Sequence, residues 1–135
     1  MDSDEQMIVV RLDSDVSAPQ LARAAIQEAL SERPADLRDI AVLLADEIVT
    51  NAVVHCGGRI EMSLVESPGR IRVEVSDTSA ALPLVRPPTA GGERGRGMLI
   101  VDSLASSWGV IRRTDGKSVW FQLDITGAGR HPPTP

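Results

Sequence analysis

Two stretches near the start of the chain carry apolar residues at the spacing of amphipathic helices. The first runs from residue 18 to about residue 30, and Ser17 with Pro19 just inside it is the best signal for its beginning. The second runs from about residue 35 to about residue 55, where the Gly-Gly pair at 57–58 is typical of a helix end. We therefore predict two consecutive helices, of which the second is longer.

Shorter runs with alternating or β-branched apolar residues predict five strands around these helices. The runs are MIVVRL at 7–12, RIEMSLVE at 59–66, RIRVEVSD at 70–77, WGVIRR at 108–113 and KSVWFQLD at 117–124. The turn sequences SPG and TDG join the last four runs into two hairpins. A third helix is expected over GMLIVDSLASS at 97–107. This order predicts an α/β (α+β) two-layer sandwich, with a mixed, mainly antiparallel sheet covered on one face by about three helices.

The segment between Thr78 and Gly97 has no apolar period and is rich in proline, glycine and alanine. Loops of about twenty residues inside compact domains are usually lids or disordered segments, so we expect a mobile lid here. The last ten residues, 126–135, are expected to form a disordered tail. The chain is thus predicted to be one domain over residues 1–125.

Composition narrows the classes of function. The formal net charge of -5 argues against direct binding of nucleic acid, which requires clustered Lys and Arg. Cys56 is the only cysteine, so no internal disulfide can form. The N-terminal sequence MDSDEQ is acidic where a secretion signal is basic, and no apolar run approaches the roughly 18 residues of a membrane helix. We expect a cytoplasmic protein with no membrane partner.

The second helix carries three polar residues that a buried helix does not need. Glu47, Asn51 and His55 are four residues apart, close to one helical turn, so they form one polar stripe beside apolar positions. One explanation is structural, with these groups capping loops or lining a hydrated seam. The other is a pocket wall, in which the carboxylate handles a proton and the amide oxygen suits Mg²⁺. The spacing alone leaves both explanations open.

Two further features could extend such a pocket. Asp77 stands at the end of the second strand of the first hairpin, where an acidic residue is also common as turn chemistry. Gly95 and Gly97 precede the third predicted helix. Glycines there allow a ligand to approach backbone amides that attract phosphate, although a flexible linker would have the same composition.

In chain order these features resemble the ATP-binding domain shared by gyrase, the Hsp90 chaperones, histidine kinases and MutL (GHKL), most closely its anti-sigma-factor serine/threonine kinase branch. The resemblance covers roughly residues 17–124. The first block of the family reads Glu, three residues, Asn, Ala, two residues, His, as do Glu47, Asn51, Ala52 and His55. The resemblance implies that Glu47 is the general base, that Asn51 ligates the Mg²⁺ bridging the ATP phosphates, and that His55 contacts the nucleotide.

The remaining blocks of the family imply further contacts with ATP. By resemblance, Asp77 binds the amino group of adenine, and residues 95–97 form the Gly-x-Gly that precedes a helix. Ser118 stands where the family has a hydroxyl beside the adenine-binding Asp. Arg94 and Arg96 are the candidates for an arginine placed against the γ-phosphate.

The resemblance implies a regulatory serine/threonine kinase that uses ATP and Mg²⁺. Its implied partners are a sigma factor, which it sequesters, and an anti-sigma-factor antagonist of STAS type, which it phosphorylates; a homodimer is also implied. One departure favours another class, because Ser79 and Ala81 replace the glycines of the family's Asp-x-Gly-x-Gly block. The alternative is a binding module of the same fold that exchanges partners without catalysis.

Overall fold

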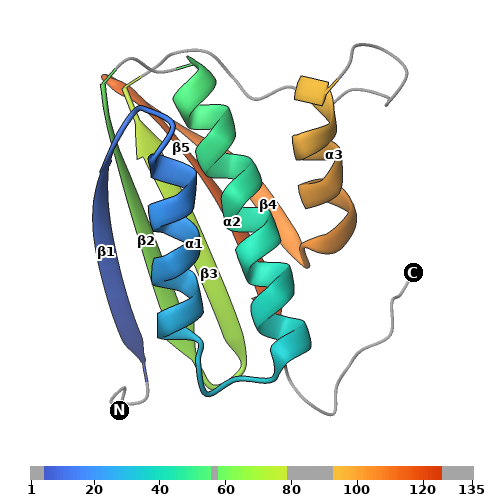
Figure 1. Ribbon diagram of the computed structural model, residues 1–135. Helices are drawn as coiled ribbons and strands as arrows, with labels where there is room; N and C mark the ends of the chain where they lie inside the picture. The colour runs from blue at the N-terminus through green and yellow to red at the C-terminus, as the bar shows by residue number, and fades with distance from the viewer. Residues whose placement is uncertain (1–4, 56–57, 79–92, 126–135) are drawn as a thin grey trace.

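In the residues described by the computed structural model (5–55, 58–78 and 93–125, with the backbone alone over 93–97), five strands form one sheet and three helices lie on one of its faces (Figure 1). In chain order the elements are β1 (Gln6–Asp13), α1 (Ala18–Ala29), α2 (Ala35–His55), β2 (Arg59–Ser67), β3 (Arg70–Asp77), α3 (Glu93–Leu104), β4 (Ser107–Arg113) and β5 (Gly116–Asp124). The predicted two-layer sandwich is confirmed. None of these described helices is long and apolar enough to cross a membrane.

The order of strands in the sheet is β1-β2-β3-β5-β4, and each neighbouring pair is antiparallel. The two predicted hairpins, β2–β3 and β4–β5, form at their short polar turns. The two hairpins are joined by the pairing of β3 with β5, which are far apart in the sequence. Asp77 at the end of β3, for example, is opposite Lys117, forty residues later. The sheet was predicted to be mixed and mainly antiparallel. All four pairs of described strands are antiparallel, so the antiparallel part of the prediction is confirmed and the mixed part is wrong.

Alternation along the strands directs one row of side chains from each strand toward the helices. These inward rows are Ile71, Val73, Val75 and Asp77 on β3, and Lys117, Val119, Phe121 and Leu123 on β5. Their apolar members belong to one core cluster with Leu44, Ile48 and Val49 of α2. The two charged residues lie at the same end of their rows and are buried there.

The N-terminus of α1 lies at the predicted residue but lacks the predicted side-chain cap. Ser17 occupies the N-cap position, but its side chain makes no capping hydrogen bond. The Ser17 hydroxyl instead donates to Oδ1 of Asp15 at 2.6 Å, and the Ser17 amide donates to the same oxygen at 2.9 Å. Both bonds lower the pKa of Asp15, and the bond from the hydroxyl has the larger effect. The prediction was right about the N-cap position, but the Ser17 side chain bonds to Asp15 and does not cap the helix.

The helix α3 begins at Glu93, four residues before the predicted start at Gly97. Glycine inside a helix costs about 1 kcal/mol relative to alanine, which is why the sequence predicts a later start. Met98 and Val101 of α3 are buried in the core, and α3 packs against α2. Gly95 and Gly97 are both helical in α3 despite their low helix propensity.

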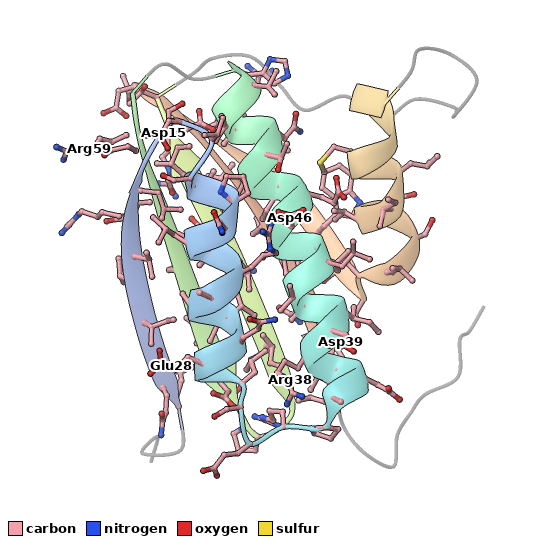
Figure 2. All side chains as sticks on the ribbon, in the orientation of Figure 1. Asp15, Glu28, Arg38, Asp39, Asp46 and Arg59 are labelled. Atoms are coloured by element: carbon pink, nitrogen blue, oxygen red, sulfur yellow. The ribbon has the colours of Figure 1, made fainter. Side chains whose placement is uncertain are left out.

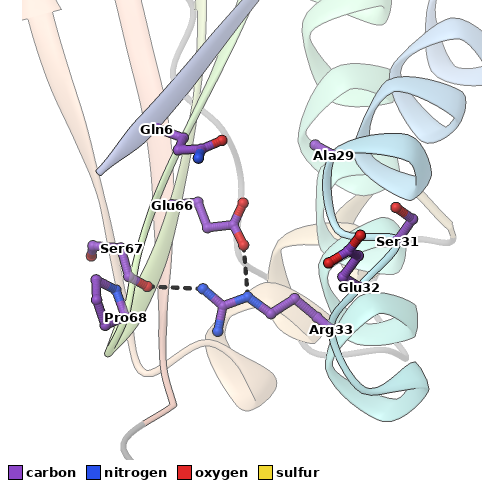
Figure 3. A pocket seen from close by; sticks show the side chains of 8 residues that line it. All are labelled: Gln6, Ala29, Ser31, Glu32, Arg33, Glu66, Ser67 and Pro68. Carbon is purple, nitrogen blue, oxygen red and sulfur yellow. Dashed lines mark hydrogen bonds and ion pairs between the residues drawn. The ribbon is translucent and has the colours of Figure 1, made fainter. Parts of the chain in front are cut away.

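The end of the sandwich opposite Asp77 is held together by Arg33, in the connection between α1 and α2. Its Nε lies 2.6 Å from Oε2 of Glu66 on β2, and a terminal nitrogen donates to the carbonyl of Ser67 at 3.0 Å (Figure 3). Arg38 in turn donates to the carbonyl of Arg33 at 3.1 Å. This cluster links the helical layer to the β2–β3 hairpin and fixes one end of α2, the helix that carries the polar stripe.

Candidate functional site

Four chain segments meet at the other end of the sandwich. The C-terminal end of α2, the last residue of β3, and the starts of α3 and β5 all lie there (Figure 1). The helix α2 packs against α3, β3 and β5. The helix with the polar stripe and the strand ends with Asp77 and Lys117 thus lie at the same end of the sandwich.

The polar stripe of α2 is present in the structure. Glu47, Asn51 and His55 are each partly buried, whereas their neighbours Ile48 and Ala52 are buried in the core. One edge of the stripe thus borders the core while the polar groups keep some exposure. The three side chains are reachable by a ligand, as a pocket wall requires.

Glu47 has the properties of a proton acceptor. Burial raises the pKa of Glu47, and the adjacent negative charge of Asp46 raises it further. Asp46 lies midway along α2 (Figure 2) and is directed to α1, where it accepts a hydrogen bond from Arg23 at 2.8 Å. A carboxylate with a raised pKa is a stronger base than an ordinary exposed one.

We expect Glu47→Gln to raise the thermal stability of the protein near neutral pH. Because the pKa of Glu47 is raised on folding, the folded state binds this proton more tightly than the unfolded state. Parental stability should therefore fall as pH rises through the raised pKa, whereas glutamine has no charge to bury. Melting temperatures measured from about pH 4 to about pH 8 should show a gap that widens with pH. A constant gap would contradict the charge penalty.

Asp77 and Lys117 form a buried ion pair at the end of the inward rows. The Nζ of Lys117 lies 3.1 Å from Oδ1 and 3.0 Å from Oδ2 of Asp77. The side chains of Lys117 and Asp77 are 5% and 1% exposed. Sequence reasoning identified Asp77 and missed Lys117. Counting back from the apolar Phe121 in steps of two would have placed Lys117, the only lysine in the chain, on the inward face.

Ser118 lies on the opposite face of the sheet from Asp77. Its hydroxyl is 2.8 Å from that of Ser76 and accepts a hydrogen bond from Nε of Arg113 at 2.9 Å. The register pairs Ser118 with Ser76 and Lys117 with Asp77, and side chains alternate along a strand. The prediction that Ser118 lies beside Asp77 is corrected: Lys117 holds that position.

Gly116 allows β5 to begin directly against the end of β3. Its φ is +152°, a backbone conformation that residues other than glycine rarely adopt. A Cβ on Gly116 would overlap the carbonyl oxygen of Asp77 and lie 2.8 Å from Cα of Thr78. The glycine thus permits the close backbone approach that places Lys117 opposite Asp77.

The predicted Gly-x-Gly at residues 95–97 lies within the first turns of α3, not in a loop before the helix. Arg94 and Arg96 belong to the same turns, and only their backbone is described, so their contact with a phosphate stays a prediction. Most of the predicted lid (79–92), the predicted tail (126–135) and Gly57, one of the two glycines expected to stop α2 after His55, lie outside the described residues.

A family model covers nearly all of the segments that meet at this end of the sandwich. The chain matches the histidine kinase-like ATPase domain over residues 12–123. It belongs to this family. The match extends from the end of β1 to the penultimate residue of β5, and it confirms the predicted membership of the GHKL-type domains.

Solved structures show the same fold for this histidine kinase-like ATPase domain. The structure of the RsbU and RsbW domains of Rv1364c from Mycobacterium tuberculosis has a TM-score of 0.68 and 19% identity, over 87% of this chain and 31% of that one. The histidine kinase domain from the Erythrobacter litoralis EL346 blue-light activated histidine kinase has a TM-score of 0.54 and 20% identity, over 79% of this chain and 59% of that one. The chain therefore spans less than two thirds of either structure. No curated protein matches it.

Membership of this ATPase family implies an ATP site, and the polar stripe suits its phosphate end. Asn51 offers an amide oxygen, the type of hard ligand that Mg²⁺ prefers. Mg²⁺ commonly keeps several waters and binds one or two protein groups together with substrate phosphates, so one side-chain oxygen fits this mode. His55, at the end of α2, can donate a hydrogen bond to a phosphate oxygen.

Proposed function

We propose that this ATPase domain is a regulatory serine/threonine protein kinase that binds Mg·ATP where α2, α3, β3 and β5 meet. The observation that carries the proposal is Glu47, a partly buried carboxylate with a raised pKa that lies one helical turn from the amide of Asn51. Phosphoryl transfer to a hydroxyl is achieved mainly by positioning and charge stabilisation, with a carboxylate to accept the proton of the hydroxyl. The stripe combines such a base with a metal ligand.

Each group of the stripe has a distinct role in the proposed reaction. Asn51 holds the metal through its side-chain oxygen, and His55 donates to the phosphates. When bound, Mg²⁺ would neutralise the negative charge that develops on the phosphates during transfer. Glu47 orients the attacking serine or threonine hydroxyl and accepts its proton. Arg94 and Arg96, in the first turns of α3, are proposed to reach the γ-phosphate, and the backbone of Gly95 and Gly97 is proposed to lie close to it.

The base of the nucleotide is proposed to lie toward β3, where Asp77 accepts a hydrogen bond from the adenine amino group. Asp77 is directed to the helical layer, at the same end of the sandwich as the C-terminal part of α2. A carboxylate is an acceptor and adenine offers an amino donor, so the two groups are complementary.

The proposed phosphate acceptor is an anti-sigma-factor antagonist of STAS type, and the proposed second partner is a sigma factor that the domain sequesters. Support comes from the fold shared with a structure that contains an RsbW domain, together with the match of Glu47, Asn51, Ala52 and His55 to the kinase branch. We further propose that the domain acts in the cytoplasm and as a homodimer.

A binding module that exchanges partners with weak or no ATP turnover is the second candidate. A specific observation favours it, because the carboxylate of Asp77 already receives hydrogen bonds from Lys117 on both oxygens. Ser79 and Ala81, in place of two glycines of the family block, point the same way. Phosphate transfer to the antagonist distinguishes the two candidates, since the binding module would still hold the sigma factor.

Isothermal titration with ATP, with and without Mg²⁺, tests the nucleotide site. We expect Mg²⁺ to strengthen ATP binding by the parent, and Asn51→Ala to lose about tenfold or more of that gain, as is typical when a metal site is weakened. Thr50→Ala is the matched control, because Thr50 is the exposed neighbour of Asn51 on α2. A parent that binds ATP equally with and without Mg²⁺ would contradict the role of Asn51.

A further inference from the structure

The ion pair between Lys117 and Asp77 has a consequence for the ligand that the site accepts. Both oxygens of Asp77 receive hydrogen bonds from a single ammonium group, at 3.1 and 3.0 Å. The Asp77 side chain is 1% exposed, so a ligand has almost no direct access to it. An amino group of a base can reach this carboxylate only if Lys117 moves or shares it.

The two partners differ in how easily they can move. Asp77 stands at the end of β3 with its backbone crowded by Gly116, and its side chain is short. Lys117 carries four methylene groups between its backbone and its charge, so its ammonium can swing away while β5 stays in place. The exchange would replace hydrogen bonds between two charged groups by one in which only the carboxylate is charged, which is weaker.

We propose that Lys117 competes with the base of the nucleotide for Asp77 and thereby sets the affinity of this site for adenine nucleotides. Lys117 on this account controls affinity: it keeps the base-binding carboxylate occupied until a nucleotide displaces its ammonium. The inference rests on the proposed function, since it takes Asp77 as the group that receives the base.

A purely structural ion pair makes the opposite prediction for affinity. If Lys117 only held the ends of β3 and β5 together, its loss would leave a buried carboxylate poorly compensated and would destabilise the protein. Nucleotide binding would then weaken or stay unchanged. Affinity and stability therefore have to be measured on the same variants.

The decisive variants are Lys117→Thr and Lys117→Arg. Threonine leaves a hydroxyl that can donate one hydrogen bond to Asp77, whereas arginine keeps a cation that can cover both oxygens. Titration with ADP should show binding tighter by about tenfold or more for Lys117→Thr, the scale of one charge-assisted hydrogen bond, and affinity close to the parent for Lys117→Arg. Circular dichroism melting establishes that each variant is folded.

The outcomes separate this inference from the proposed function. Tighter binding by Lys117→Thr supports the competition, even if the parent binds too weakly to measure. Equal or weaker binding by folded Lys117→Thr, with clear binding by the parent, overturns the competition and leaves the ATP site standing. No binding of ADP or ATP by either protein overturns both.

The parent itself provides a second measurement, which stands even if Lys117→Thr does not fold. Lys117 is the only lysine, so selective ¹⁵N labelling of lysine side chains gives one ammonium resonance. Saturation with ADP should shift this resonance, because the ammonium leaves or shares its carboxylate. A parent that binds ADP with the Lys117 resonance unchanged would overturn the competition.

Discussion

Replacing Glu47 by glutamine should lower the rate of phosphate transfer to the antagonist by about 10² to 10⁴, the usual effect of losing a general base. Glutamine keeps the volume of the side chain and much of its hydrogen bonding, but it cannot accept the proton of the attacking hydroxyl. Folding and Mg·ATP affinity should survive, because the stripe retains Asn51 and His55. Single-turnover transfer of labelled γ-phosphate, with titration and thermal melting of the same variant, measures all three quantities.

Asp46→Asn is the matched control for this experiment. Asp46 is the adjacent carboxylate on α2, but its hydrogen bond goes to Arg23 on α1. Transfer by Asp46→Asn should stay within a few-fold of the parent. An equal loss in both variants would indicate a general effect of charge on α2 and contradict a specific base. A parent that holds a sigma factor but transfers no phosphate to any antagonist would favour the binding module.

The dependence of transfer on pH gives an independent reading of the same residue. Because burial and Asp46 raise the pKa of Glu47, the parental rate should increase with pH through that raised pKa, above the ordinary range of a carboxyl group. The residual rate of Glu47→Gln should lack this rise. A rise of the same shape in both proteins would assign the titration to another group.

Gly116→Ala should be among the most destabilising substitutions in the described part of the chain, lowering the free energy of unfolding by about 3 kcal/mol or more. The added Cβ would overlap the carbonyl oxygen of Asp77, and the φ of +152° is strained for alanine. The Cβ would collide with backbone atoms of Asp77 and Thr78, which cannot rotate away as a side chain can. The overlap can be removed only if the ends of β3 and β5 move apart. Urea denaturation followed by circular dichroism measures the loss.

Gly58→Ala is the matched control for the glycine. A Cβ on Gly58 would meet Oγ1 of Thr78 at 3.5 Å, an ordinary van der Waals distance, and Gly58 has no positive φ. Its cost should stay below about 1 kcal/mol. Comparable losses in the two variants would contradict the backbone overlap at Gly116.

The helices and the polar stripe could be predicted from sequence because their pattern is local. Glu47, Asn51 and His55 are related by a four-residue step, and the helical period alone places them on one face. The bounds of α2 were predicted for the same reason, since the apolar period runs through it without a break. The alternating strands and their turns indicated the two hairpins, which are also local.

The partner of Asp77 could not be found in this way. Lys117 is forty residues away, and it meets Asp77 only because β5 pairs with β3 in one particular register. A shift of that register by one residue would have placed Ser118 there, as the family resemblance led us to expect. The start of α3 was misplaced because the sequence expectation took Gly95 and Gly97 to precede the helix, whereas both lie within it.

The sequence by itself thus determined the elements of this ATPase domain, the face of α2 that carries a base and a metal ligand, and the family to which these residues belong. Periodicity and short motifs carry that information within a few turns of chain. Tertiary structure alone decided which side chain meets Asp77, how tightly Gly116 presses β5 against β3, and how far burial raises the pKa of Glu47. Each of these depends on packing between segments that are distant in the sequence, and local sequence patterns do not predict that packing.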